Sequence, residues 1–358
     1  MSAARLERLR DLLVAERLDA LIIDGAANLR YLTGYTGSSG LALVGAAGEA
    51  RFLTDFRYET QAAVEVDPAF EREIVTGEML EALARGLDAP RVGFDESLTS
   101  VRRHRILAEH APGGVELLPT SGLVERLRTV KDEREISAIA AAAALVDEIY
   151  SWLFEAGLGG RTEREVAVAL EHEMRLRGAR DPAFGSIVAS GTAGALPHAQ
   201  PRDVAIEPGT LVTVDIGALR EGYCSDCTRT VAVGEPGEHA REIHALVLEA
   251  QLAGLAAVTA GVSGREADGA AREVIEDGGH GEHFGHGLGH GVGLEIHESP
   301  RLSRVGGEAV LAPGNVVTVE PGVYLPGELG VRIEDLVVVR DGAPLVLSGF
   351  TKELLSVD

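Results

Sequence analysis

The residues best suited to chemistry are carboxylates at the ends of two similar segments. EPGTLVTVDIG occupies residues 207–217 and APGNVVTVEPG occupies residues 312–322, an offset of 105. Both contain Pro-Gly, then Val-Thr-Val, then an acid, then glycine two residues later. A Pro-Gly turn before a strand is common, so chance similarity is one explanation. Because a buried strand would continue with apolar residues, the acids in register, Asp215 and Glu320, favour a duplicated strand that ends in a carboxylate.

A returning strand with a second acid follows each segment. Asp226 lies on the first returning strand and Glu334 on the second. If Ala218 pairs with Tyr223, the antiparallel register sets Asp215 directly opposite Asp226, with Cβ atoms about 5 Å apart. The second segment does the same, so we expect two hairpins that each place a pair of acids opposite one another.

Acids this close repel one another unless one is protonated or a cation lies between them. Any one of them alone is best explained as a solvated strand end or half of a salt bridge. Four together carry about four negative charges, which two divalent cations would neutralise, whereas burial without metal costs several kcal/mol per ion. Oxygen-rich ligation favours Mn²⁺, with Zn²⁺ or Co²⁺ as alternatives. Arg332 shares a face with Glu334 by the two-residue period of a strand.

Histidines are concentrated just before the second segment. Residues 285–297 read GHGLGHGVGLEIH and contain His286, His290 and His297. One imidazole among oxygen ligands is common in two-metal sites. The alternative is a glycine-rich surface tract that binds nickel adventitiously. His198, in Leu-Pro-His, precedes the first segment and is expected to reach the same site.

The first third of the chain alternates between helices and strands. Residues 4–18 place leucines on one face of an amphipathic helix. Further expected strands are 21–23, 41–44, 51–53, 73–75 and 91–94, and further helices are 56–66, 78–87 and 99–110, with a Gly/Thr/Ser-rich segment at 28–40. This alternation predicts a small α/β domain.

Charge concentrates at residues 125–135, just before a long helix expected over 132–154. We place the domain boundary there, giving domains 1–124 and 125–358. After this helix come long Val/Thr/Ile-rich stretches broken by Pro-Gly turns. That pattern predicts an antiparallel sheet with helices on one side.

Composition narrows the class of protein. The 358 residues are 45% apolar and 25% charged, with a net charge of −23, so phosphate backbones and anionic membranes are repelled. No signal peptide is expected at the N-terminus, and the alanine-rich stretch 136–146 is too short to span a bilayer. Cys224 and Cys227 are expected to be buried small hydrophobes rather than a redox or zinc half-site. A soluble cytoplasmic protein, binding neither nucleic acid nor membrane, is expected.

Several motifs together resemble a known family. They are NLRYLTG at 28–34, LPH at 196–198, VDIG and SDCTRT within 214–230, HGLGHGVGLEIHESP at 286–300, VEPG at 319–322 and RIED at 332–335. Over nearly its whole length the chain resembles the pita-bread metallopeptidases, specifically Xaa-Pro dipeptidase (prolidase) and aminopeptidase P. The resemblance implies an α+β fold, with a C-terminal pita-bread (creatinase/aminopeptidase-like) domain and a smaller N-terminal α/β domain.

The resemblance also implies a ligand set for two divalent metal ions. The implied ligands are Asp215, Asp226, His290, Glu320 and Glu334. Asp226 and Glu334 would bridge both ions, and a hydroxide bridging the ions would attack the Xaa-Pro bond of dipeptides or short peptides.

Roles around the metals follow from the same resemblance. Glu320 is similar to the acid/base that passes a proton to the leaving proline nitrogen, and His297 to the histidine that stabilises the oxyanion. His198, with His286, matches histidines that contact substrate; we count His198 among the catalytic residues with Glu320 and His297. Arg332 resembles a substrate-facing or supporting arginine. Arg301 resembles an arginine that reads the carboxylate after proline.

Two alternatives stay open. Aminopeptidase P activity would release the residue before proline from longer peptides. A non-catalytic metal- or peptide-binding protein on the same fold is possible in principle, although the complete ligand set favours catalysis. Creatinase has the fold without the metal cluster, so the complete ligand set argues against that activity. Relatives of this kind are often homodimers, so a homodimer is expected.

Overall fold

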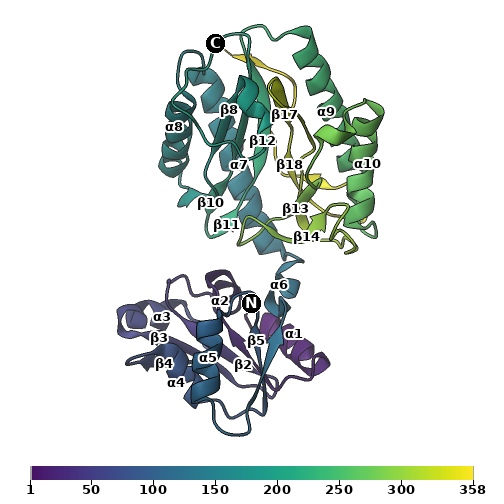
Figure 1. Ribbon diagram of the computed structural model, residues 1–358. Helices are drawn as coiled ribbons and strands as arrows, with labels where there is room; N and C mark the ends of the chain where they lie inside the picture. The colour runs from purple at the N-terminus through teal and green to yellow at the C-terminus, as the bar shows by residue number, and fades with distance from the viewer. Residues whose placement is uncertain (1, 358) are drawn as a thin grey trace. The chain divides into compact units, whose positions relative to one another are not determined.

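The computed structural model describes residues 2–357, which form two compact units (Figure 1). One unit runs through Arg128 and the other begins at Thr129. The boundary expected at residues 124 and 125 falls within α6 (Leu123–Arg128). Charge alone does not mark the end of a helix, since α6 carries part of the charged run itself.

The first unit is built on a six-stranded mixed sheet. Its strand order is β4-β3-β2-β1-β5-β6. The strands are β1 (Ala20–Ile23), β2 (Leu41–Gly45), β3 (Ala50–Asp55), β4 (Glu71–Val75), β5 (Arg91–Asp95) and β6 (Glu116–Thr120). The helices are α1 (Ser2–Ala15), α2 (Ala26–Thr33), η1 (Phe56–Tyr58), α3 (Glu59–Glu65), α4 (Met79–Arg85), α5 (Val101–His110) and α6. The predicted small α/β domain is confirmed.

Three elements of this unit were not predicted: α2, α6 and β6. The sequence suggested a Gly/Thr/Ser-rich segment from residue 28 onward, where most of α2 lies, and Asn, Tyr and Thr favour helices only weakly. Burial of Leu29 and Leu32 stabilises this helix. Gly34 ends it with φ 82°, the left-handed conformation that glycine adopts without strain.

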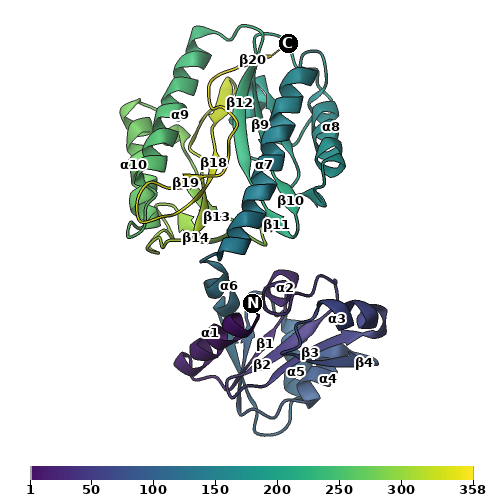
Figure 2. The same ribbon diagram turned by 180° about the vertical axis from the view of Figure 1, so that it is seen from behind.

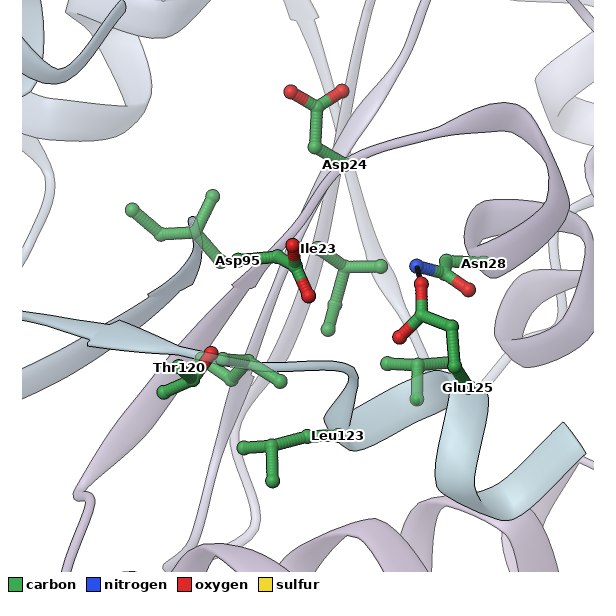
Figure 3. Close-up of a pocket in the computed structure, with 10 residues that line it drawn as sticks. Ile23, Asp24, Asn28, Asp95, Thr120, Leu123 and Glu125 are labelled. Carbon is green, nitrogen blue, oxygen red and sulfur yellow. Dashed lines mark hydrogen bonds between the residues drawn. The ribbon is translucent and has the colours of Figure 1, made fainter. Parts of the chain in front are cut away.

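A small pocket opens at the carboxyl ends of the parallel strands β1, β5 and β6 (Figure 3). Ligands bind at this kind of sheet edge in many α/β folds. Here the acids are engaged within the unit: the Asn28 amide donates to Glu125 Oε1 at 2.6 Å, and the Gly122 N–H donates to Asp95 Oδ2 at 2.9 Å. These contacts tie α2 and α6 to the sheet.

The second unit consists of two similar halves, each with a pair of helices packed on its own sheet. The helices are α7 (Glu133–Ala156), α8 (Glu163–Leu176), α9 (Glu238–Ala257) and α10 (Gly264–Asp277), with short helices η2 (Gly191–Ala195) and η3 (Gly281–His283). Figures 1 and 2 show α8 on one flank and α9 with α10 on the other. The sequence suggested one sheet covered on one side, whereas the structure has two main sheets.

The first half holds the sheet β20-β12-β9-β8 and the second holds β14-β13-β15-β18-β19. Their strands are β8 (Ile187–Ser190), β9 (Leu211–Ile216), β12 (Cys227–Val233), β20 (Ser356–Val357), β13 (Gly289–Gly291), β14 (Glu298–Leu302), β15 (Val316–Val319), β18 (Asp335–Val338) and β19 (Leu345–Val346). Shorter ladders are made by β7 (Asp181–Pro182), β10 (Ala218–Arg220), β11 (Tyr223–Cys224), β16 (Gly322–Leu325) and β17 (Leu329–Arg332). The two predicted hairpins are therefore β9–β12 and β15–β18.

Apolar cores lie between helices and sheets. Side chains of α7 and α8 pack against β8, β9 and β12, and those of α9 and α10 pack against the strands of the second half. Helix α7 is long and apolar enough to cross a membrane by length and composition alone. Its residue Tyr150 is fully buried and its hydroxyl lies 2.9 Å from the carbonyl oxygens of both Val214 and Cys227, so α7 is a core helix of this unit.

Both cysteines are free and buried. Cys227 packs in the core of the first half and Cys224 in a separate apolar cluster. Burial raises the pKa of the Cys224 thiol to about 12. The expectation of buried small hydrophobes is confirmed, because two protonated thiols in separate clusters do not form a redox pair.

Candidate active site

The register of the first hairpin differs from the predicted one. Asp215 lies opposite Thr228, and Arg220 pairs with Tyr223, so the predicted pairing of Ala218 with Tyr223 is wrong. The reason is the turn: Glu221 and Gly222 both have positive φ, 49° and 83°, as the two-residue type I′ hairpin turn requires. That tight turn shifts the register by two residues, so Asp226 is not directly across from Asp215.

The second hairpin has the expected register. Val319 pairs with Asp335 in β15–β18, and Gly322 pairs with Arg332 in β16–β17. The same register continues through the interval between these ladders. Glu320 and Glu334 therefore fall opposite one another.

His290 brings the two hairpins' acids together. Its Nε2 lies 3.3 Å from Glu320 Oε1 and 3.6 Å from Asp226 Oδ2. Its Nδ1 lies 3.1 Å from the Gly291 carbonyl oxygen, which accepts a hydrogen bond only if Nδ1 carries the proton. The lone pair of Nε2 then faces the acids, as in a histidine that ligates metal. Ligand atoms of Asp226, His290 and Glu334 all lie within 4.8 Å of one another.

Arg332 compensates one of the acids. Its Nη2 donates to Asp215 Oδ2 at 2.7 Å, and its Nη1 donates to the Tyr324 hydroxyl at 3.0 Å. The other oxygen of Asp215, Oδ1, is buried and accepts no hydrogen bond from the residues that the structure describes. A buried carboxylate oxygen without a donor suits a cation.

Two threonine hydroxyls orient two more of the acids. Thr228 donates to Glu334 Oε2 at 2.7 Å, and Thr318 donates to Glu320 Oε1 at 3.0 Å. Sequence reasoning missed both threonines, and Tyr324 as well. The two-residue period of a strand would have found the threonines, since each lies two residues from a site acid.

The electrostatics of the cluster are unfavourable without a cation. Burial, and then repulsion by Glu334, Asp215 and Glu320, raises the pKa of Asp226 well above its usual value. Burial and the neighbouring acids likewise raise the pKa of Glu334 well above its usual value. Burial lowers the pKa of His290, which keeps it neutral. The donor set, an unsatisfied Asp215 oxygen and a neutral imidazole facing the acids all fit divalent metal.

The remaining predicted residues lie around this cluster. His286 Nδ1 donates to the Gly287 carbonyl at 2.8 Å, so its Nε2, 2.8 Å from the Tyr324 oxygen, accepts from that hydroxyl. The ring of His297 meets that of His290 edge-on, with centroids 4.3 Å apart. Arg301 pairs across β13–β14 with His290 and is exposed. His198 is exposed; burial lowers the pKa of His297, and the neighbouring His290 and then His198 lower it further.

The glycine-rich tract is closely packed rather than a surface tag. A Cβ on Gly289 would lie 2.0 Å from the Thr318 carbonyl oxygen, so no side chain fits there. Buried Arg272 holds the tract by donating to the carbonyls of Phe284 at 2.8 Å and His286 at 2.7 Å. Asp268 pairs with this arginine and also accepts the Leu288 N–H at 2.9 Å.

We expect the thermal stability gained from metal to grow with pH. Asp226 and Glu334 have raised pKa values in the folded chain, so the metal-free folded state binds more protons than the unfolded state, and its stability falls as pH rises above about 4. Metal binding displaces those protons and removes the repulsion. Each kcal/mol shifts Tm by about 2–4 °C in a domain of this size.

The measurement is the difference in Tm between Mn²⁺-loaded and chelated protein at pH 5.5 and pH 8. This difference should widen by several degrees toward pH 8, because groups that titrate alike in both forms cancel. A constant or shrinking difference would contradict the repulsion argument.

A cluster of carboxylates from two duplicated hairpins, joined by a histidine from β13 in a two-sheet unit, fits a metal-binding protein of the pita-bread type. Metallopeptidase family M24 matches residues 136–341, and the creatinase/prolidase N-terminal domain matches residues 5–130. The chain belongs to metallopeptidase family M24, and its α+β fold combines these two domains.

Individual relatives agree with this assignment. A structure titled Xaa-Pro dipeptidase from Bacillus anthracis is 39% identical, with a TM-score of 0.96 and all of both chains covered. A Pyrococcus horikoshii protein named Xaa-Pro dipeptidase is 36% identical over 344 residues, 94% of this chain and 95% of that protein. The X-Pro aminopeptidase structure from Thermotoga maritima is 36% identical, with a TM-score of 0.88 over 96% of this chain and 100% of that one.

Proposed function

We propose that this metallopeptidase hydrolyses the Xaa-Pro bond of dipeptides with two divalent ions, held by Asp215, Asp226, His290, Glu320 and Glu334. The observation that carries the proposal is the convergence of three ligand atoms within 4.8 Å, one from each of Asp226, His290 and Glu334. The names of similar proteins support the substrate class. Oxygen-rich ligation favours Mn²⁺, with Zn²⁺ or Co²⁺ next.

Asp226 and Glu334 are the acids that would be shared between the two ions, as the family resemblance implies; Asp226 is repelled by three other site acids and Glu334 by Glu320 and Asp215. We assign Asp215 to one ion through its unsatisfied Oδ1, and His290 with Glu320 to the other. Two divalent ions, when bound, would supply a hydroxide nucleophile at neutral pH and polarise the scissile carbonyl.

The chain's own residues transfer the proton and orient the substrate. Burial raises the pKa of Glu320, which suits it to hold a proton and pass it to the leaving proline nitrogen. The Thr318 hydroxyl fixes one of its oxygens. His297, His198 and His286 are assigned to the substrate, His297 to the oxygen that becomes negative. Tyr324 connects Arg332 to His286 by hydrogen bonds and so sets the direction of that ring.

Arg301 is the residue we assign to the substrate's free carboxylate. It lies on the strand next to His290, and no carboxylate among the described residues 2–357 pairs with it. An exposed guanidinium beside a metal cluster suits the carboxylate that directly follows proline in a dipeptide. Aminopeptidase P activity is the second candidate, favoured by the likeness to the Thermotoga maritima structure.

The test is hydrolysis of Ala-Pro and Ala-Pro-Ala by chelated protein resupplied with Mn²⁺, Zn²⁺ or Co²⁺. We expect Ala-Pro to be preferred, and Arg301→Ala to raise KM for Ala-Pro by roughly 10–100-fold, the loss of one bond to a charged group. Ala-Pro-Ala should change little, since its carboxylate lies one residue further away. Arg304→Ala, nearby and exposed, is the control.

An equal effect of Arg301→Ala on both peptides would contradict the carboxylate assignment. Preference of the wild-type protein for Ala-Pro-Ala would establish the aminopeptidase instead. Protein that binds metal and hydrolyses neither peptide with any of the ions would be a binding protein.

We further infer a soluble cytoplasmic protein that works as a homodimer on small peptides. The net charge of −23 supports solubility and the absence of nucleic-acid and anionic-membrane partners. The homodimer rests on the family resemblance.

A further inference from the structure

A buried carboxylate outside the metal cluster, Glu163, accepts more hydrogen bonds than any of the site acids described above. It is the first residue of α8, and its side chain is 0% exposed. It accepts hydrogen bonds from the Ser190 N–H at 2.8 Å and hydroxyl at 2.7 Å. It also accepts from the Arg202 N–H at 2.9 Å, Nε at 2.9 Å and Nη2 at 2.6 Å.

These two partners are the ends of one loop. Ser190 is the last residue of β8, and Arg202 lies twelve positions later. We call residues 191–201 the histidine loop, because His198 lies within it. Glu163 therefore closes the base of the histidine loop, and Arg202 Nη2 adds a bond to the Ser190 carbonyl at 3.2 Å.

The histidine loop also makes a second contact, with strand β17, which carries Gly330 and Arg332. A Cβ on Gly330 would lie 1.8 Å from the Gly194 carbonyl oxygen, so the two backbones touch. Arg332, which also binds Asp215, donates from Nη1 to the Pro197 carbonyl at 3.2 Å. His198 follows that proline directly.

The hydrogen bonds that close the loop depend on the negative charge of Glu163 as well as on the shape of its side chain. Burial raises the pKa of Glu163, but hydrogen bonds from Arg202 and Ser190 outweigh it, so the pKa lies below its usual value and the group is ionised at neutral pH. Every partner is a donor. A neutral amide at this position would direct its own N–H groups toward donors and break at least one side of the closure.

We propose that Glu163 is a positioning residue that fixes His198 beside the metal site by binding both ends of the histidine loop. We call its hydrogen bonds with Ser190 and Arg202 the clasp. This inference rests on the proposed function in one respect, the contact of His198 with substrate. Glu163 itself touches neither the site acids nor His198 among its hydrogen-bond partners.

The experiment compares Glu163→Gln with Val166→Ala. Val166 is fully buried on the same helix and packs in the apolar core, so its truncation destabilises the unit without breaking the clasp. We expect Glu163→Gln to raise KM for Ala-Pro by roughly 10-fold or more, the loss of a charged hydrogen bond. Mn²⁺ affinity by calorimetry should stay within about twofold, since all five ligands are intact.

Hydrogen exchange provides a readout that needs no turnover. In Glu163→Gln the amides of residues 192–200 should exchange faster than in wild type, and in Val166→Ala they should not. Faster loop exchange in a chain that hydrolyses no peptide would leave the clasp standing and remove only the proposed function. Equal KM and equal loop exchange in both variants would overturn the clasp.

Arg202→Gln covers the case in which Glu163→Gln does not fold. The Arg202 side chain is 42% exposed, and its loss leaves the backbone N–H and both Ser190 donors on Glu163. A smaller rise in KM and in loop exchange is expected. Wild-type values of both in Arg202→Gln would also overturn the clasp.

Discussion

Asp226→Asn is expected to lose bound metal and peptidase activity together. Asp226 stands among three other acids, Glu334, Asp215 and Glu320, and we assign it to both ions. Asparagine keeps the shape and removes the charge that would neutralise the cations. The loss should be roughly 10²–10⁴-fold in metal affinity and kcat/KM, equivalent to the ~3–5 kcal/mol cost of removing one partner of a buried charge pair.

The variant's stability should change in the opposite direction. Because the buried acids repel one another, metal-free Asp226→Asn should melt at or above the Tm of chelated wild type. Metal content after dialysis, calorimetry and Ala-Pro hydrolysis check the first part, and a thermal melt checks the second. Asp341→Asn, at an exposed position, is the control. Full metal occupancy with full activity would refute the ligand assignment.

Glu320→Gln is expected to lower kcat by roughly 10²–10⁴-fold, the usual contribution of a general acid or base. Glutamine keeps an oxygen beside His290 and Thr318, but it cannot hold and release a proton. KM and metal content should change much less than kcat, because the other four proposed ligands remain.

The pH profile separates this role from simple ligation. The limb of kcat that depends on Glu320 should disappear in Glu320→Gln. Thr318→Val, which removes the hydroxyl and leaves the carboxyl, should keep that limb at a lower rate. Near wild-type turnover in Glu320→Gln would assign the proton transfer to another group. Complete loss of metal would show that the main role of Glu320 is to bind metal rather than to transfer a proton.

The two hairpins show how much of the site could be predicted from the sequence. The duplicated Val-Thr-Val-acid segments predicted two strands that end in carboxylates, and β9 and β15 are those strands. The second register was predicted correctly, whereas the first was wrong by two residues. The difference came from Glu221, a non-glycine residue at φ 49°, which forms a tighter turn than its residue type suggests.

Contacts between residues far apart in the sequence were harder to predict from the sequence. The two-residue period shows that Thr228 and Thr318 share faces with site acids, but it does not show which carboxylate each hydroxyl reaches. The protonated nitrogen of His290 depends on a local carbonyl oxygen that only the folded backbone supplies. Glu163, in an ordinary helix start, carried no chemical signal before its partners at 190 and 202 were known.

The sequence by itself determined which chemical groups are present: which strand ends carry acids, where the histidines cluster, and that such a concentration of acid needs cations. The tertiary structure decided which of those groups meet. Residues 226, 290 and 334 come from separate elements, and they converge because two sheets, each backed by its own helices, pack their hairpins side by side. Periodicity fixes the face of a strand that a side chain occupies, but the distance between two strands far apart in sequence is set only by packing.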